Sequence, residues 1–400
     1  MAELRTVLTT REVPALLTTS MVGRLPTAMA TLAVLLLVRG QGGSYTLAGG
    51  LAALFTAGAG IGQPGLARVV DRLGQWQVLL VAGVVSTLAF VVLAMSGADH
   101  PVVSAVAAAV AGLGTPPLEP CLRALWPHLV TDGPVLRAAF SLDVGVQELV
   151  FVVGPLLSVA GVSLIGDGGG VLGCAVFGLA GTLGFMATRT SREWRPTPST
   201  SDTHGSPLRH GVLVRIFLVA LATGVPVGAL AIVAAAFADR HDSSSITGWA
   251  LAANAFGALL AGLFGAVRPI TSSGARALTA AGLALAIGYL PLALPLPVVL
   301  WIPAAAVAGL ALPVVLTLVF QRVQLLCPPN LLTEANAWVV TAFGLGAATA
   351  ALLAGIVTDH LHTSTAIPTM VLAGALFTAT VCLLSHRDDP APSDMPAALG

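Results

Sequence analysis

The stretch "GQPGLARVVDRLGQ", residues 62–75, carries three charges between long segments that have almost none. These charges belong to Arg68, Asp71 and Arg72. At residues 262–275 the chain reads "GLFGAVRPITSSGA" and repeats the glycines and the first arginine at the same spacing, whereas Asp71 and Arg72 have no charged counterpart. The sequence therefore predicts a duplicated connection that retains its acid and its second arginine in one copy only.

The composition predicts that most of the chain is surrounded by lipid. Of the 400 residues, 56% are hydrophobic and 9% are charged, whereas soluble domains carry about 25% charged residues. So few charges cannot cover a soluble surface of this size. Because the net charge is zero, we expect no nucleic-acid partner.

The sequence predicts neither a metal site nor an enzyme active site. Its four cysteines lie in or at the ends of apolar segments without a C-x-x-C neighbour, which is typical of small buried hydrophobes. No histidine is paired with a carboxylate at metal-ligand spacing, and no phosphate loop or nucleophile–base set is present. We therefore expect no cofactor, and an ion gradient as the energy source.

Twelve apolar segments approach the roughly 20 residues that a membrane helix needs. The first six lie near 17–38, 46–67, 77–97, 102–124, 138–163 and 170–188, and the last six near 212–237, 247–267, 276–297, 299–320, 335–358 and 366–385. A polar linker rich in Ser, Thr and Pro separates them. The predicted units are a six-helix half at 1–188, a linker at 189–211, a second half at 212–386 and a tail at 387–400.

Arginine placement predicts the orientation. With the N-terminus inside the cell, fifteen arginines fall at cytoplasmic ends and loops, whereas Arg39 and Arg240 fall outside. Such a bias predicts that both termini are cytoplasmic. We expect a monomer that crosses a bacterial inner membrane several times.

A second internal similarity supports duplication. The segment "AVAGLGTP" at 109–116 returns as "AVAGLALP" at 306–313, in the corresponding helix of the other half. Because six is an even number of helices, the two halves have the same orientation. Parallel repeats of this kind leave a cavity between them near the bilayer midplane.

Six plus six helices, a polar central linker and a charged turn after the second helix resemble the major facilitator superfamily. The family signature in that turn runs roughly G-x-x-x-D-R-x-G-R-[RK]. Asp71, Arg72 and Gly74 match it, whereas Ala67 stands at the first glycine and residues 75–76 replace the basic pair. The resemblance implies an all-α polytopic fold and alternating access, and leaves the substrate open.

A second signature of the superfamily, found in its exporters, ends in G-P-x-x-G-G. Gly154 and Pro155 match it, but Ser158 and Val159 replace the closing glycines. The resemblance implies efflux. The alternative is a proline kink with close helix packing, which glycine and proline favour in any membrane helix.

Ionisable groups at membrane depth cost about 2.5–3.5 kcal/mol on insertion scales, so each is a candidate functional residue. Glu148 lies roughly 15 Å into the fifth segment, at 1.5 Å per residue. Desolvation disfavours a buried carboxylate, so we expect Glu148 to bind and release a proton. The alternative is a structural pair with Arg24, which in turn could bind an anionic group or extend to the cytoplasmic face. Glu119 and Arg123 are four residues apart and predict a local ion pair.

Asp143 lies nearer the cytoplasmic end of the same segment. We expect it to bond Arg68 or Arg72, with a second role in proton coupling as the alternative. The second half holds few polar groups at membrane depth, and the candidates to line its side of the cavity are Thr223, Asn254, Thr317 and Gln321.

The charged turn predicts a latch between the halves, built from Arg68, Asp71, Arg72 and Gly74. We expect Asp71 and Arg72 to reach the other half, with Asp71 at the N-terminus of the eleventh helix, residues 333–335. The positive end of a helix dipole favours a carboxylate there. Such a contact would stabilise the outward-open state.

The combined interpretation is a proton-coupled antiporter that exports small amphipathic or lipophilic molecules. A proton-linked importer or a sugar exporter is the alternative within transport. A non-transporting membrane scaffold or a membrane-embedded enzyme is the alternative outside it. An enzyme would need clustered catalytic residues, which the sequence lacks.

Overall fold

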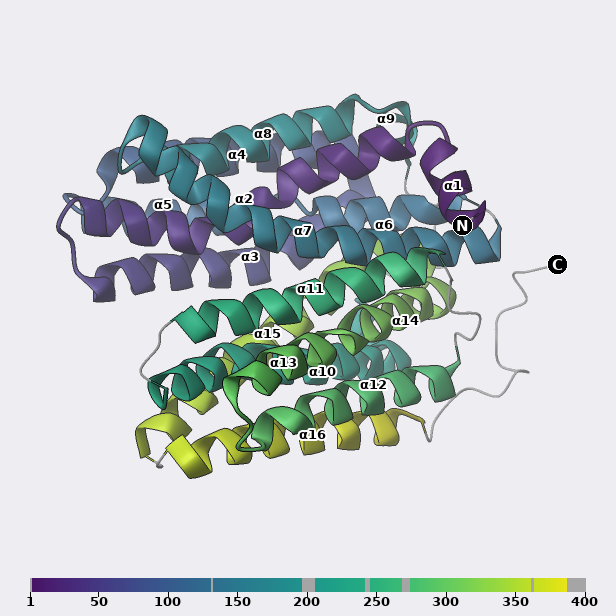
Figure 1. The fold of residues 1–400 in the computed structure, drawn as a ribbon. Helices are drawn as coiled ribbons and strands as arrows, with labels where there is room; N and C mark the ends of the chain where they lie inside the picture. The colour runs from purple at the N-terminus through teal and green to yellow at the C-terminus, as the bar shows by residue number, and fades with distance from the viewer. Residues whose placement is uncertain are drawn as a thin grey trace.

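The computed structural model describes residues 2–130, 132–195, 206–241, 245–267, 274–360 and 363–386. Within these ranges the regular structure is entirely helical (Figure 1). The first half comprises α1 (Ala2–Thr9), α2 (Val13–Gly40), α3 (Tyr45–Leu73), α4 (Gln75–Ser96), α5 (Pro101–Leu113), α6 (Leu118–Leu129), α7 (Gly133–Ile165) and α8 (Gly169–Ala187). After it come α9 (Arg189–Glu193) and the short 3₁₀ helix η1 (Pro207–Arg209).

The second half comprises α10 (Gly211–Asp239), α11 (Ser245–Val267), α12 (Ala275–Tyr289), η2 (Leu290–Ala293), α13 (Val298–Gly309), α14 (Ala311–Leu326), η3 (Pro329–Leu331), α15 (Leu332–His360) and α16 (Thr363–His386). Figure 1 shows the two halves one above the other, with α1 and α9 at the same end. We call this end the linker end. Along the boundary α3 packs on α15 and α7 packs on α11.

Eleven helical segments of the described residues are long and apolar enough to cross a membrane. Two of them join consecutive α-helices, α5 with α6 and α13 with α14, and two more join an α-helix with the short η2 or η3. The predicted segment 46–67 lies in α3, which has 29 residues and is not among the eleven. The predicted all-α polytopic membrane fold is confirmed.

Side chains on the outside of the bundle are apolar, as a lipid environment requires. Met95, Leu164 and Val299 are 80%, 84% and 80% exposed. The four cysteines are buried without disulfides. A local signal begins α3 where the chain turns: the side chain of Ser44, the residue before the helix, accepts the Leu47 amide at 3.1 Å.

The two halves repeat one packing contact. Gly58 of α3 lies against the carbonyl oxygen of Ala109 in α5, and a Cβ on this glycine would lie 2.7 Å from that oxygen. Gly257 of α11 lies in the same way against the carbonyl oxygen of Ala306 in α13, which leaves no room for a Cβ. Both contacts use the segments that repeat in the sequence, so duplication extends from sequence to packing.

The repeated segment also interrupts the helix in both halves. A break separates α5 from α6, and a turn separates α13 from α14. Just before each interruption a glycine contacts a neighbouring backbone: Gly112 lies on the carbonyl oxygen of Phe55, and Gly309 on that of Asn254. Without a Cβ, these glycines let α5 approach α3 and α13 approach α11.

Two hydrophobic clusters form the core. One joins the halves, and its first-half members include Val7, Trp126 and Phe140 near the linker end. The other surrounds Met29 and Phe90 and stays within the first half. The cluster shared by the halves therefore draws on the linker-end part of the first half.

Candidate functional site

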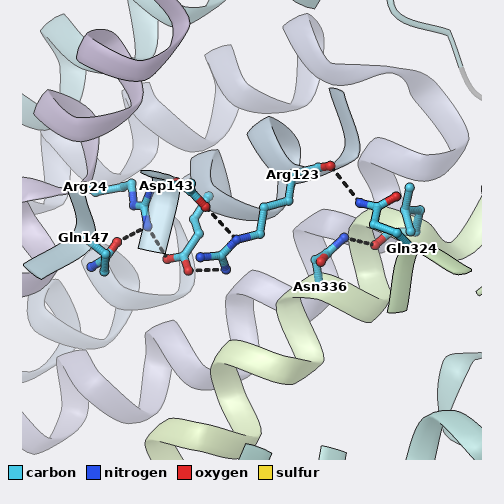
Figure 2. A network of polar contacts seen from close by, with 8 residues as sticks. Arg24, Arg123, Asp143, Gln147, Gln324 and Asn336 are labelled. Atoms are coloured by element: carbon cyan, nitrogen blue, oxygen red, sulfur yellow. Dashed lines mark hydrogen bonds and ion pairs between the residues drawn. The ribbon is translucent and has the colours of Figure 1, made fainter. Parts of the chain in front are cut away.

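Four charged side chains meet inside the first half: Arg24 of α2, Glu119 and Arg123 of α6, and Asp143 of α7 (Figure 2). One terminal nitrogen of Arg24 donates to Asp143 Oδ1 at 2.8 Å, and the other lies 3.1 Å from Glu119 Oε2. Arg123 donates from Nε to Asp143 Oδ2 at 2.8 Å and also pairs with Glu119. The network contains two positive and two negative groups, so its charges balance.

The network is buried, and its partners correct one expectation. Asp143 is completely buried, and Arg24 and Arg123 are 5% and 1% exposed. The predicted bond from Asp143 to Arg68 or Arg72 is wrong. Asp143 faces the interior of the first half, where two guanidinium groups take both of its oxygens.

Arg24 is not paired with Glu148, which was the structural alternative for that carboxylate. Arg24 of α2 donates instead to the side-chain oxygen of Gln147, which precedes Glu148 in α7. Arg24 therefore faces the turn of α7 that holds Gln147 and Asp143. The ion pair predicted between Glu119 and Arg123 is confirmed.

The network ends at the second half. The carbonyl oxygen of Arg123 accepts a hydrogen bond from Gln324 Nε2 at 2.8 Å, and the Arg123 guanidinium lies 3.5 Å from the ring centroid of Phe320. Both partners belong to α14. Figure 2 shows Gln324 and, from α15, Asn336 on the side of the network where Arg123 lies. Asn336 donates to the Leu332 carbonyl of its own helix at 2.8 Å. The charged centre of one half therefore contacts the other half through a backbone carbonyl and an aromatic ring.

Glu148 follows Gln147 in α7 but lies outside the network. It is partly buried near the middle of this 33-residue helix, and among the described residues its carboxyl group makes no hydrogen bond or ion pair. It is close enough to Tyr289 of α12 for an electrostatic interaction. Asn254 of α11 donates to the Tyr289 hydroxyl at 3.4 Å. The carboxyl group of Glu148 in the first half therefore lies near the Tyr289 hydroxyl of the second half, which Asn254 contacts.

The other polar candidates of the second half are distributed through its packing. Thr223 is completely buried and donates to a carbonyl of its own helix at 2.7 Å. Asn254 also donates to the Ala305 carbonyl at 2.9 Å. Thr317 is 1% exposed. Gln321 is 6% exposed, and both polar atoms of its amide are buried without a hydrogen-bond partner in the described residues, which gives it unused binding capacity.

The charged turn contacts the second half at the linker end. Asp71 is 5% exposed and accepts hydrogen bonds from the backbone amides of Thr333, at 3.2 Å, and Glu334, at 2.8 Å. These amides belong to the first turn of α15, which has no internal acceptors for them. The contact expected for Asp71 is therefore present.

Arg68, and not Arg72, makes the second contact across the halves. Its Nε and Nη2 donate to the two carboxylate oxygens of Glu334 at 2.9 and 2.6 Å. Glu334 is 1% exposed and also accepts from Trp338 Nε1 at 3.3 Å. Arg72 is exposed and makes no hydrogen bond or ion pair within the described ranges; α3 continues through it to Leu73, so Arg72 lies on the outer face of the helix.

Glycines position the remaining predicted residues. Gly74 has φ 97°, a conformation that side chains rarely adopt, and separates α3 from α4. Gly154 of α7 lies against Ala28 of α2, where a Cβ would be 2.7 Å from the alanine Cβ. Pro155 follows inside the same helix. The second copy of the charged turn, at 268–273, lies outside the described residues.

Sequence reasoning missed Glu334, Gln147 and Tyr289. Glu334 had a detectable signal, because it is an acid in the first turn of the helix assigned to Asp71. Gln147 and Tyr289 had none, since their roles depend on how neighbouring helices are rotated.

Solved structures provide the comparison. The human organic anion transporter MFSD10 has a TM-score of 0.72 with this chain at 16% identity, over 93% of this chain and 99% of that chain. A bacterial homologue of the iron transporter ferroportin, in an outward-facing state with soaked iron, has a TM-score of 0.69 at 16% identity, over 94% and 99%. The Escherichia coli fucose:proton symporter FucP has a TM-score of 0.71 at 11% identity, over 93% and 97%. No protein-family model and no curated protein matches the sequence.

Proposed function

Because the chain has the fold of the major facilitator superfamily, we propose that it is a secondary transporter that exports small amphipathic or lipophilic molecules in exchange for protons. The observation that carries this proposal is Glu148, a carboxyl group near Tyr289 of the other half that has no hydrogen-bond or ion-pair partner among the described residues. A proton that binds there changes the charge at the boundary without leaving an arginine unpaired.

Asp143 differs from Glu148 in this respect. Protonation of Asp143 would remove one of the two carboxylate partners of two buried arginines, which is costly. We therefore assign proton coupling to Glu148 and a structural role to Asp143. Gln321, with its unpaired amide, is the residue of the second half best suited to contact a cargo molecule.

Alternating access would then proceed by rocking of the two halves. We assign the linker end to the cytoplasm, which the arginine bias supports. The bonds of Asp71 and Arg68 to α15 join the halves there, so their presence corresponds to a state closed to the cytoplasm and open outward. Inward opening requires that they break.

The cargo class follows from the surroundings of Glu148. The second half supplies few ionisable groups at membrane depth, which favours an apolar or amphipathic molecule over a sugar. Proton-linked uptake is the alternative, favoured by the similar fold of FucP, a fucose:proton symporter. A non-transporting scaffold would not need a carboxyl group at this depth.

Substrate-induced proton release from the purified full-length protein tests the proposal. Compounds from a panel of lipophilic cations and neutral amphiphiles are added in weakly buffered detergent solution, and the pH change is recorded. We expect release from the parent and none from Glu148→Gln. Glu193→Gln, a change in an exposed ion pair, is the control and should behave as the parent.

Proton release that persists in Glu148→Gln would contradict the assignment of the proton site. A panel that never displaces protons would contradict antiport itself. Resistance of a pump-deleted bacterial host that expresses the parent, compared with accumulation of the same compounds, distinguishes export from uptake.

A further inference from the structure

A pocket of about 420 Å³ lies at the linker end of the first half, where α4 begins and α8 ends. It is lined by Trp76, Leu183, Met186, Ala187 and Arg192. The pocket is separate from the charge network and from Glu148. One wall is apolar, one edge is aromatic and one corner is cationic.

A buried hydrogen bond builds this corner. Gln75, which is completely buried, accepts from Ser191 Oγ at 3.0 Å and donates to the Cys121 carbonyl at 3.2 Å. Trp76 directly follows Gln75, and Arg192 directly follows Ser191. The bond between the first residues of each pair therefore holds the start of α4 against α9, and Trp76 and Arg192 both line the pocket there.

The positive charge of the Arg192 guanidinium is available to bind an anion. Its Nε donates to the Met186 carbonyl at 3.2 Å, which places the side chain against the end of α8. No carboxylate within the described ranges pairs with it. The neighbouring carboxylate does not neutralise it, because Glu193 is paired with Arg189. Arg195, a second cation, bonds to the backbone carbonyl of Arg192, at 2.7 Å.

The pocket opens on the lipid side of the bundle. Trp76 is 39% exposed and Leu183 is 45% exposed, and Figure 1 shows α4 and α8 on the outer side of the first half, away from the second half. Trp and Arg side chains at the end of membrane helices mark the boundary between hydrocarbon and water. A molecule in this pocket therefore meets both phases.

We propose that this pocket binds an anionic phospholipid. Its phosphate binds the terminal nitrogens of Arg192, its glycerol region packs on the Trp76 indole, and the start of an acyl chain follows Leu183 and Met186. A guanidinium is a suitable partner for phosphate because it presents several donors in one plane. The lipid would join α9, at the start of the predicted linker, to the membrane-facing surface of the first half.

Native mass spectrometry of the full-length protein, released from micelles that contain phosphatidylglycerol or phosphatidylcholine, tests the proposal. The parent should retain phosphatidylglycerol in preference to phosphatidylcholine. Arg192→Ala should lower the bound fraction about fivefold, the effect of one basic residue near an anionic surface. Trp76→Ala should lower retention of both lipids.

Arg189→Ala is the matched control, because Arg189 lies on the same short helix and is already paired. It should retain phosphatidylglycerol as the parent does. Equal retention of the two lipids, or an unchanged preference in Arg192→Ala, would overturn the proposal. Inorganic phosphate is the second arm: displacement of the lipid at millimolar phosphate would show an anion site without lipid selectivity and would also overturn it.

Discussion

Two charged regions of the molecule both pair arginines with carboxylates, but their partners come from different places. In the network of Arg24, Glu119, Arg123 and Asp143 every ion pair lies within the first half. At the linker end Arg68 and Asp71 bond to the first turn of α15 in the second half. In the proposed transport cycle a contact inside one half would persist while the halves rock, so we expect it to contribute to folding stability. A contact between the halves would break in each cycle, so we expect it to set the populations of the two states.

The largest effect is expected from Asp143→Ala. The change leaves two buried arginines with Glu119 as their remaining carboxylate, and loss of one partner from a buried ion pair costs about 3–5 kcal/mol. The thermal unfolding temperature in detergent should fall strongly, whereas the inward and outward populations of the folded fraction should not change. Glu193→Ala, which breaks an exposed pair, should leave the unfolding temperature as it is. An unfolding temperature for Asp143→Ala equal to that of the parent would contradict the comparison.

Asp71→Asn should have the opposite pattern. The amide keeps one acceptor oxygen but loses the charge that strengthens both bonds from α15, and a hydrogen bond to a charged group contributes about 1.5–3 kcal/mol. We expect about a tenfold shift toward the state open at the linker end, with little change in unfolding temperature. Spin labels at Leu73 and Leu325, which are exposed at the linker ends of α3 and α14, report the distance between the halves. An unchanged distance distribution would mean that Asp71 is not a latch.

Arg68→Ala should shift the same equilibrium less. The Arg68 side chain is 42% exposed, so solvent screens its pair with Glu334 and its contribution is about 1 kcal/mol or less. The matched control is Arg72→Ala, four residues further along α3 and without a partner in the described residues. The same spin-label distances are measured. If both alanine variants shift the populations equally, net charge at the linker end, and not the Glu334 contact, is responsible.

The smallest effect is expected from Glu12, which precedes α2 with φ 69°. Partial burial opposes ionisation of its carboxyl, but hydrogen bonds from Thr190 and from the Arg189 amide outweigh it and lower the pKa below the ordinary value near 4.5. The folded-state pKa is thus below the unfolded-state pKa. The carboxylate therefore stabilises the fold above pH 4.5 and loses this effect as the pH falls through the lowered pKa.

Both partners of Glu12 lie in α9, directly after the first half, and not in the second half, so the comparison predicts an effect on unfolding and none on populations. The unfolding temperatures of the parent and of Glu12→Gln, measured from pH 7 down to pH 3, should converge at the acidic end. A difference that grows on acidification would have the wrong sign.

Sequence reasoning succeeded where local geometry decides. Glu119 and Arg123 pair because a spacing of four places them on one side of a helix. Asp71 was assigned to the start of α15 because that helix end offers free amides. The repeated segment at 109–116 and 306–313 identified the duplication, but the continuous helices predicted at 102–124 and 299–320 are each interrupted in the structure.

The failures share one physical cause. The partners of Arg24 and Asp143 depend on the rotation of α2 and α7 about their axes. In a soluble helix an apolar stripe reveals that rotation, but here both the core-facing and the lipid-facing sides are apolar. The same ambiguity concealed the bonds of Asn254 to Tyr289 and Ala305, which the sequence could only place somewhere in the second half.

Because all four cysteines are buried, the alkylation rate of the native thiols can report on opening of the protein. Three of them are at most 1% exposed, and Cys327 is 8% exposed. Cys327 ends α14 directly before the segment that leads into α15, near Asp71 and Glu334. Opening at the linker end would admit water-soluble maleimides to this thiol first, so its alkylation rate would follow the inward-open fraction without any introduced label.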